Sequence, residues 1–248
     1  MGRSAIEWTD YTWSPVTGCS MVSTGCRNCY AKRMAEQFQR DGKARYRYGF
    51  KPTIHPDVLE EPLGWKTSRL IFVCSMSDLF HEEVPFEYLE RVFAIMRRTP
   101  RHTYQVLTKR AERMRELGNK IGWPSNIWAG VTVEHPRYVK RRIPELLDTE
   151  ARLRFVSFEP LVAEIGPFDF TGIDWVIVGG ERGNRVRPMD EAWALDLLRQ
   201  ARAAGVPFFF KQHGDAAGIM GYKDQLLGGK KIQELPEQAG NQPSLFDL

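Results

Sequence analysis

The sequence has few cysteines and no long apolar run. Among its 248 residues, no apolar stretch approaches the roughly 18 needed to cross a bilayer, and no basic segment near the N-terminus leads into an apolar one. We therefore expect a cytoplasmic protein that makes no membrane contact. The four cysteines are too few and too clustered for a disulfide scaffold, so Cys26 and Cys29 are better interpreted as metal ligands in a reducing compartment.

The signatures of several common enzyme classes are also missing. The chain contains no nucleophile elbow, Walker loop or Rossmann fingerprint, and it has no internal sequence repeat. Its five histidines lack metal-ligand spacing such as His-x3-His, and we expect each to be structural or exposed: His55, His81, His102, His135 and His213. The cysteines are therefore the main chemical signal of the chain.

Three of the cysteines, Cys19, Cys26 and Cys29, lie in one short stretch with the spacing Cys-x6-Cys-x2-Cys. Three thiols fall one short of a closed tetrahedral zinc site, but they suit a 4Fe-4S cluster that keeps one iron open for a ligand. Two alternatives remain: a zinc site completed by Cys74 or a histidine, and plain buried cysteines. Cys74 lies inside an apolar run, where we expect a small core residue.

A repeated unit of an apolar run, a polar cluster and a helical pattern indicates the fold. The apolar runs cover residues 69–75, 103–107, 126–131, 153–157, 174–178 and 207–210, after a first candidate strand at 11–17. Near-continuous apolar strands are typical of a parallel sheet that is buried on both faces. We predict an α/β fold with about seven parallel strands in a TIM-like (β/α) barrel or partial barrel; a doubly wound sheet is the alternative.

We predict a barrel domain over residues 1–215, an irregular extension and linker over 216–241, and a tail over 242–248 that is a candidate clamp-binding peptide. The tail contains Gln242, Leu245 and Phe246 in a Gln-x-x-Leu-Phe pattern, which resembles the short peptides that bind the bacterial DNA sliding clamp. An extended terminus with two apolar anchors suits recognition by a pocket. The alternative is an ordinary frayed tail.

Polar side chains follow the predicted strands directly. Because the carboxyl ends of barrel strands open onto one face, we expect these side chains to converge there. The set is Ser75, Ser77, Asp78, Thr108, Lys109, Thr132, Glu134, Glu159, Glu181, Lys211 and Gln212. Buried charges need partners or a ligand. We select Lys109, Glu181 and Lys211 as candidate catalytic groups; the alternative is an internal network of Lys–Glu pairs that closes the barrel end.

Cations and aromatic side chains alternate between residues 27 and 51, and more arginines follow between 91 and 115. Cations neutralise phosphates and rings stack on bases, so nucleic acid is the predicted partner. The candidate contacts are Lys32, Arg33, Arg45, Arg47 and Arg110. Solvated helix faces are the alternative interpretation.

Eight short motifs together resemble the phage-associated three-cysteine-motif family of unknown function. They are WSPVTGC (13–19), GCRNCYA (25–31), SMSDLF (75–80), LTKR (107–110), GVTVE (130–134), SFEPL (157–161), VGGE (178–181) and FKQ (210–212). The resemblance covers about residues 5–215 and implies a radical-SAM-like barrel. The shorter elements Cys-x2-Cys-Tyr (26–30) and Leu-Thr-Lys (107–109) also resemble spore photoproduct lyase, a radical SAM enzyme that repairs DNA. We expect DNA rather than RNA as the partner.

The resemblance also implies S-adenosylmethionine as a second cofactor, held by the free iron of the cluster. By position it assigns the cofactor to Ser75, Ser77 and Asp78. We add Thr132, and Glu134 or Glu159 as the contact to the ribose hydroxyls, as further candidate cofactor-binding residues. The sequence departs from the usual radical SAM pattern in two respects. Radical SAM enzymes usually have three residues between the first two cysteines, whereas here there are six. Their Gly-Gly-Glu element usually follows the second strand, whereas here it is residues 179–181. We thus expect a radical-SAM-like enzyme of DNA repair or modification; the alternative is a nucleic-acid-binding module with a structural zinc or iron-sulfur site.

Overall fold

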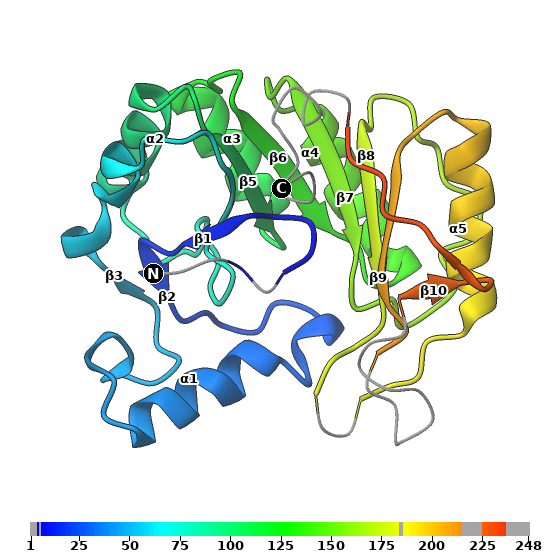
Figure 1. The fold of residues 1–248 in the computed structure, drawn as a ribbon, viewed down its shortest axis with the longest axis horizontal. Helices are drawn as coiled ribbons and strands as arrows, with labels where there is room; N and C mark the ends of the chain where they lie inside the picture. Colours follow the sequence, from blue (N-terminus) through cyan, green and yellow to red (C-terminus); the bar gives the residue numbers. More distant parts are fainter. Residues whose placement is uncertain (1–3, 5, 184–185, 215–224, 237–248) are drawn as a thin grey trace.

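The computed structural model describes residues 4, 6–183, 186–214 and 225–236, and its centre is a curved parallel sheet (Figure 1). Seven strands form this sheet in the order β1-β4-β5-β6-β7-β8-β9. They are β1 Tyr11–Trp13, β4 Leu70–Val73, β5 Thr103–Thr108, β6 Ile127–Thr132, β7 Leu153–Phe158, β8 Trp175–Gly179 and β9 Phe208–Gln212. The spatial order follows the chain without the reversal of a doubly wound sheet. The predicted partial TIM-like barrel is therefore confirmed.

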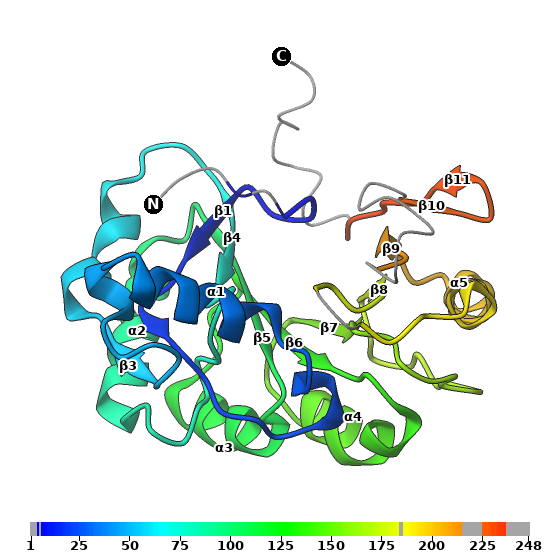
Figure 2. The ribbon, with the colours of Figure 1, turned by 90° about the horizontal axis from the view of Figure 1, so that it is seen from below.

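Helices cover the convex face of this half-barrel, as Figures 1 and 2 show. The covering helices are α2 Phe86–Arg98, α3 Ala111–Ile121, α4 Val139–Leu147 and α5 Glu191–Ala203, and the remaining helix is α1 Tyr30–Arg40. On α2, Leu89, Val92 and Phe93 recur at helical spacing and are buried in the same core as Ile71 and Val73 of β4. The helix α1 is set apart from this layer and lies beside the open side of the half-barrel (Figure 1).

The shorter elements within the described residues are two antiparallel strand pairs and five single turns of 3-10 helix. The pairs are β2 Val16–Thr17 with β3 Thr53–Ile54, which lie far apart in the chain, and the hairpin of β10 Leu226–Leu227 with β11 Lys230–Lys231. The turns are η1 Thr24–Cys26, η2 Ala44–Tyr46, η3 Pro56–Val58, η4 Glu61–Gly64 and η5 Pro136–Tyr138. Within the described ranges, no helix is long and apolar enough to span a bilayer. The predicted clamp-binding residues Gln242, Leu245 and Phe246 lie outside the described residues.

A second apolar core fills the concave face of the sheet. Because successive strand residues point to opposite faces, alternate positions such as Phe72 and Trp175 face inward. The N-terminal segment adds Trp8, whose ring centroid lies 4.6 Å from that of Phe72 and 6.0 Å from that of Trp175. The interior of the half-barrel is therefore packed with aromatic rings.

The first predicted strand, residues 11–17, is wrong in one respect, because it is broken into β1 and β2. Pro15 lies between the two strands and has no N–H to donate to a ladder. Its carbonyl instead accepts the backbone N–H of His55 at 2.8 Å, next to the β2–β3 pair. The cysteine stretch therefore follows β2, which pairs with β3, and not a strand of the barrel sheet.

Gly130 tests the packing of the concave face. It pairs with Phe155 on the neighbouring strand, and a Cβ atom on Gly130 would lie 2.3 to 2.6 Å from three ring atoms of Phe155. We expect Gly130→Ala to lower the free energy of unfolding by about 1–3 kcal/mol, measured by urea denaturation, because the ring cannot move without disturbing the core. Gly64→Ala is the matched control, since no atom lies within 4 Å of its Cβ position. Equal midpoints for the two variants would contradict the expectation.

Candidate cofactor site at the carboxyl ends of the strands

A cavity opens at the carboxyl ends of the barrel strands, beside the cysteine stretch. It has about 1120 Å³ of empty space, part of which is open to solvent. The structure brings to it nine of the polar strand-end residues: Ser75, Ser77, Asp78, Thr108, Lys109, Thr132, Glu159, Glu181 and Lys211. Cys19, Cys26 and Cys29 line it from the other side. The predicted convergence of strand ends and cysteines on one face is therefore present.

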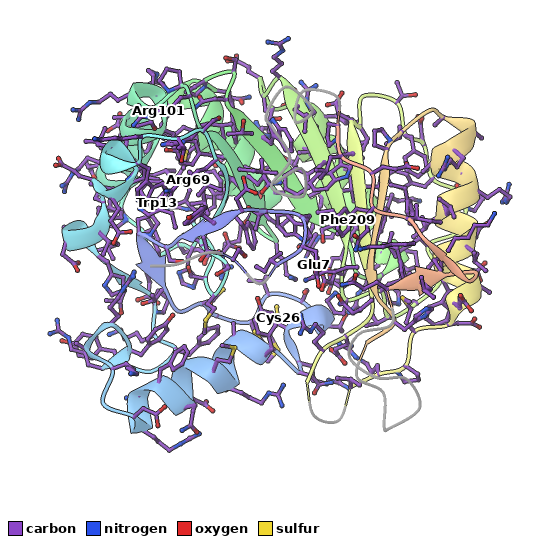
Figure 3. The ribbon with its side chains drawn as sticks, viewed as in Figure 1. Glu7, Trp13, Cys26, Arg69, Arg101 and Phe209 are labelled. Atoms are coloured by element: carbon purple, nitrogen blue, oxygen red, sulfur yellow. The ribbon has the colours of Figure 1, made fainter. Side chains whose placement is uncertain are left out.

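The cysteine loop, residues 18–29, is shaped by its backbone. Gly18 has a φ of +78°, and a Cβ atom there would lie 2.3 Å from the carbonyl oxygen of Lys51, so only glycine fits. The N–H of Cys19 donates to the carbonyl of Phe50 at 3.0 Å, which ties the start of the loop to a distant segment. The loop ends where α1 begins, and Figure 3 shows Cys26 beside the start of that helix.

The floor of the cavity is apolar, whereas its walls are polar. Trp8, Phe72 and Leu107 reach it from the inner core of the half-barrel. An apolar base with a few convergent polar groups is the usual composition of a site that binds an organic cofactor or substrate. The walls and floor together suit a ligand with one charged and one flat apolar part.

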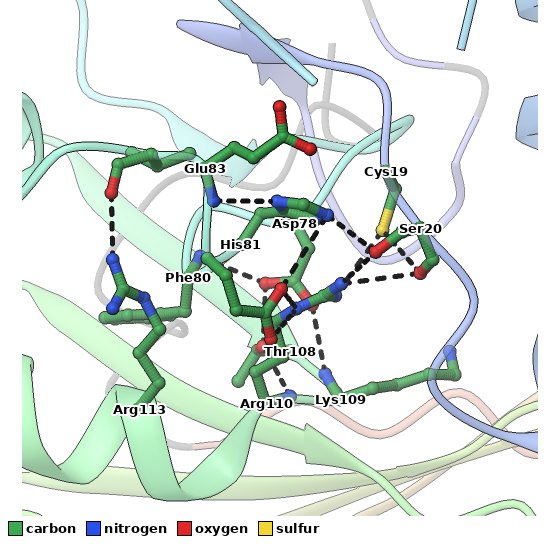
Figure 4. Close-up of polar contacts among 12 residues, drawn as sticks. Cys19, Ser20, Asp78, Phe80, His81, Glu83, Thr108, Lys109, Arg110 and Arg113 are labelled. Carbon is green, nitrogen blue, oxygen red and sulfur yellow. Dashed lines mark hydrogen bonds and ion pairs between the residues drawn. The ribbon is translucent and has the colours of Figure 1, made fainter. Parts of the chain in front are cut away.

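A buried ion network joins the cysteine loop to β4 and β5 (Figure 4). Arg110 is 6% exposed and donates to Asp78 Oδ2 at 3.0 Å, to both oxygens of Glu82 at 2.8 and 2.9 Å, and to Cys19 Sγ at 3.5 Å. It also donates to Ser20 Oγ at 2.9 Å. Arg110 was predicted to contact nucleic acid; the structure places it inside the molecule, where these partners occupy its guanidinium.

The same network determines the tautomer of His81. The backbone N–H of Glu83 donates to His81 Nδ1 at 3.1 Å, so in the neutral ring the proton lies on Nε2, which is 2.7 Å from Ser20 Oγ. Burial and the charge of Arg110 lower the pKa of His81, which keeps the ring neutral near pH 7. His81 is therefore a structural residue, as expected from its sequence context.

The loop thiols differ in acidity. Burial, reinforced by the carboxylate of Asp78, raises the pKa of Cys19 to about 11, although Arg110 opposes the shift. Burial also acts to raise the pKa of Cys26, but the charge of Lys109 and hydrogen bonds from Val22 and Ser23 outweigh it, and the net pKa is lowered. Lys109, predicted as a catalytic group, therefore lies close enough to Cys26 to stabilise its thiolate.

The other two predicted catalytic groups are engaged in ion pairs. Lys211 Nζ donates to the two carboxylate oxygens of Glu159 at 2.8 and 3.1 Å. Glu181 is 4% exposed, pairs with Arg187 and accepts the amide of Asn28 in the cysteine loop at 2.9 Å. These contacts match the internal network that was the alternative interpretation of the strand ends.

Glu134 lies behind the cysteine loop and not on the cavity wall. It is fully buried, accepts Arg142 Nη1 at 2.7 Å and accepts the backbone N–H of Gly25 at 3.2 Å. A Cβ atom on Gly25 would lie 2.9 Å from the Glu134 side chain, so the approach requires glycine. Burial opposes ionisation of Glu134, but Lys109 and Arg142 outweigh it and lower the pKa. Glu134 therefore links the cysteine loop to Arg142 of α4 and is not free to contact a ligand in the cavity.

Sequence reasoning missed several residues of the site. Cys74 is 3% exposed, as predicted for a core residue, but it also lines the cavity and has a φ of +62°. Cys74 directly precedes Ser75, one of the predicted strand-end residues, and this neighbour could have indicated that Cys74 lines the cavity. Trp8 and the anchoring residue Arg142 carried no local signal, because their roles depend on contacts with distant segments.

A single metal ion and a cluster make different demands on these residues. Zinc needs its donors at about 2.0–2.3 Å from one point. Across the part of the chain that the structure describes, no group of three or more His, Cys, Asp or Glu side chains could hold one ion. A 4Fe-4S cluster binds each thiolate to a different iron, so its ligands need not meet at one point. The donor set, three thiols around one cavity, is chemically compatible with such a cluster.

The predicted nucleic-acid contacts differ in accessibility. Lys32, Arg33 and Arg47 are exposed on α1 and on the loop after it. Arg45 is half-buried and donates to the carbonyl of Ser14. Arg110 is buried, as described above. The exposed cations are thus the ones available to an external anion.

The fold and the cavity define an α/β protein built on a parallel half-barrel, with four cysteines lining one pocket at the carboxyl ends of its strands. The chain belongs to the family described as "Protein of unknown function (DUF5131)", whose profile matches residues 3–236. No curated protein and no solved structure matches the chain. The family description states no activity, so a function has to be inferred from the site.

Proposed function

We propose that this protein is an iron-sulfur, radical-SAM-like enzyme that acts on nucleic acid in the cytoplasm. The observation that carries the proposal is the placement of Cys19, Cys26 and Cys29 around one cavity at the strand ends of a parallel half-barrel. When bound, a 4Fe-4S cluster with one open iron supplies the electron that cleaves S-adenosylmethionine. The four cysteines are free, which suits a reducing compartment.

The surrounding residues have distinct tasks in this proposal. The three thiols would hold the cluster. The charge of Lys109 helps to lower the pKa of Cys26, whereas Arg110, which donates to Cys19 Sγ at 3.5 Å, only opposes the rise in the pKa of Cys19 that burial causes. Ser75, Ser77, Asp78, Thr132 and Glu159 provide the polar wall for S-adenosylmethionine. The apolar floor keeps water away from reactive intermediates.

Nucleic acid is the proposed substrate class, with DNA favoured over RNA. It is supported by exposed cations near the cavity, among them Lys32 and Arg33 in the first turn of α1. Binding of a sliding clamp through Gln242, Leu245 and Phe246 stays a prediction from the sequence. The second candidate function is a nucleic-acid-binding module with a structural metal, which the Lys211–Glu159 pairing favours because the two charges are paired without a ligand.

Anaerobic purification tests the proposal. We expect about four iron and four sulfide per chain, a brown colour, and release of 5'-deoxyadenosine when the reduced protein is given S-adenosylmethionine. A colourless protein with one zinc per chain would contradict the iron-sulfur site. A cluster without 5'-deoxyadenosine, in a protein that still binds DNA, would favour the binding module.

A further inference from the structure

The segment from residue 27 to residue 51 presents an unbalanced positive charge on the surface beside the cavity. Its exposed cations are Arg27, Lys32, Arg33, Arg40, Lys43, Arg47 and Lys51, and its carboxylates are Glu36 and Asp41. Among the residues that the structure describes, none of these seven cations forms an ion pair with a carboxylate. A surface of this kind attracts an anionic partner.

Exposed apolar side chains gather in the same region. Nine large hydrophobic side chains are exposed in the described ranges, and five of them fall between residues 21 and 48: Met21, Val22, Tyr30, Met34 and Tyr48. Met21 is 70% exposed and Tyr48 is 55% exposed. Val22 and Tyr30 also line the cavity, which places this apolar group at its mouth. Phosphate contacts alone would not require these apolar groups.

Contacts between distant segments unite these residues into one surface. Phe50 lines the cavity, and the amide of Gln39 on α1 donates to the carbonyl of Arg47 at 3.0 Å, so residues 43–51 lie against α1. Arg33 reaches to the loop after β8, where a Cβ atom on Gly183 would lie 1.7 Å from its Nη2 atom. The segment with the rings therefore lies along α1, and Arg33 extends from this helix to the loop after β8.

We propose that residues 20–34 and 43–51 form a docking strip for a single strand of nucleic acid, which passes over the cavity mouth and presents one base to the apolar floor. Single-strand sites combine cations that follow the backbone with rings on which bases stack, and sequence readout is not required. A base already free of a duplex enters such a pocket without the cost of unstacking. The inference rests on the proposed function for the identity of the substrate, but the binding itself needs no turnover.

Two charge-reversal variants with the same composition test the strip. Lys32→Glu with Arg33→Glu changes an adjacent pair in the first turn of α1, where glutamates favour the helix. Lys140→Glu with Arg141→Glu changes an equally exposed adjacent pair on α4, on the convex side of the half-barrel. Fluorescence anisotropy with a labelled single-stranded DNA of about 20 nucleotides reports the affinity of each.

The strip variant is expected to raise Kd at least about tenfold and to lower the slope of log Kd against log salt by about 1.4, since two phosphate contacts are lost. The α4 variant is expected to change Kd by less than about threefold at 0.15 M salt, because distant charges are screened. Tyr48→Ala should weaken binding about tenfold with an unchanged salt slope, whereas Tyr48→Phe keeps the stacking ring and the affinity.

Three results would overturn the docking strip. They are no binding of single-stranded DNA by the unchanged protein, equal losses in the two charge-reversal variants, and tighter binding of the corresponding duplex than of the single strand. Iron is measured on the same samples. A protein that binds single strands through the strip but holds no iron would contradict the iron-sulfur function and leave the strip in place.

Discussion

Replacing Cys19, Cys26 or Cys29 singly with alanine is expected to reduce the iron of anaerobically purified protein from about four per chain to below about one. Each thiol would ligate its own iron in the proposed site, so the loss of one thiol leaves one iron without its protein ligand. Iron and sulfide analysis measures the loss, and circular dichroism confirms that the fold is kept. Formation of 5'-deoxyadenosine should fall below detection in the same variants.

Cys74→Ala is the matched control for this series. Cys74 lines the same cavity but belongs to the end of β4, so its removal leaves the three proposed ligands in place. We expect full iron content, with a stability loss of about 1 kcal/mol for a small buried side chain. Full iron content in all three loop variants would contradict the proposed ligand set. Loss of iron in Cys74→Ala as well would instead make it a fourth ligand.

Arg110→Met is expected to lower the free energy of unfolding by about 3–5 kcal/mol, because it leaves the carboxylate of Asp78 buried beside no cation. Asp78 is 5% exposed, and its other hydrogen-bond donors are uncharged groups, among them the Thr108 hydroxyl at 2.7 Å. The change also removes the hydrogen bonds from Arg110, the residue before α3, to Ser20 and Cys19, so we expect the cysteine loop to hold iron less tightly. Urea denaturation and iron analysis measure the two effects.

Arg113→Met is the control for Arg110→Met, because Arg113 lies three residues further along the chain and donates to the carbonyl of Val84 at 2.8 Å. Its loss should cost about 1 kcal/mol, the value of one hydrogen bond. The double change of Asp78→Asn with Arg110→Met should lower the free energy of unfolding by less than the sum of the two single changes. The reason is that each single change leaves the other side chain buried without its partner. Equal losses for the Arg110 and Arg113 variants would show that the buried network adds no stability.

Much of the fold was accessible from the sequence because parallel strands that are buried on both faces leave a simple pattern. Apolar runs such as 103–107 and 153–157 coincide with β5 and β7 within one residue, and each is followed by polar groups at the cavity. The first strand was mispredicted because its apolar pattern continues through Pro15, whereas the missing N–H ends the ladder there.

The site was harder to predict because its chemistry depends on which charged groups meet. Glu134 follows a strand, which is the position expected for a cofactor contact. Its carboxylate instead accepts hydrogen bonds from Arg142 and from the backbone N–H of Gly25, and so holds the cysteine loop in place. Arg110 belongs to a basic run, yet burial beside Asp78 removes it from the surface. No local pattern distinguishes these two roles, since burial is a property of the assembled layers.

Local sequence was thus sufficient for the half-barrel, the cysteine spacing and the set of polar strand ends, because strand periodicity and chain order are local properties. Contacts between segments distant in the chain were needed to show that Cys74 lines the cavity, that Lys211 pairs with Glu159, and that cations and rings gather at the mouth. The physical reason is that burial and neighbouring charge, which determine what an ionisable group can do, arise only when the sheet, the loop and α1 come together.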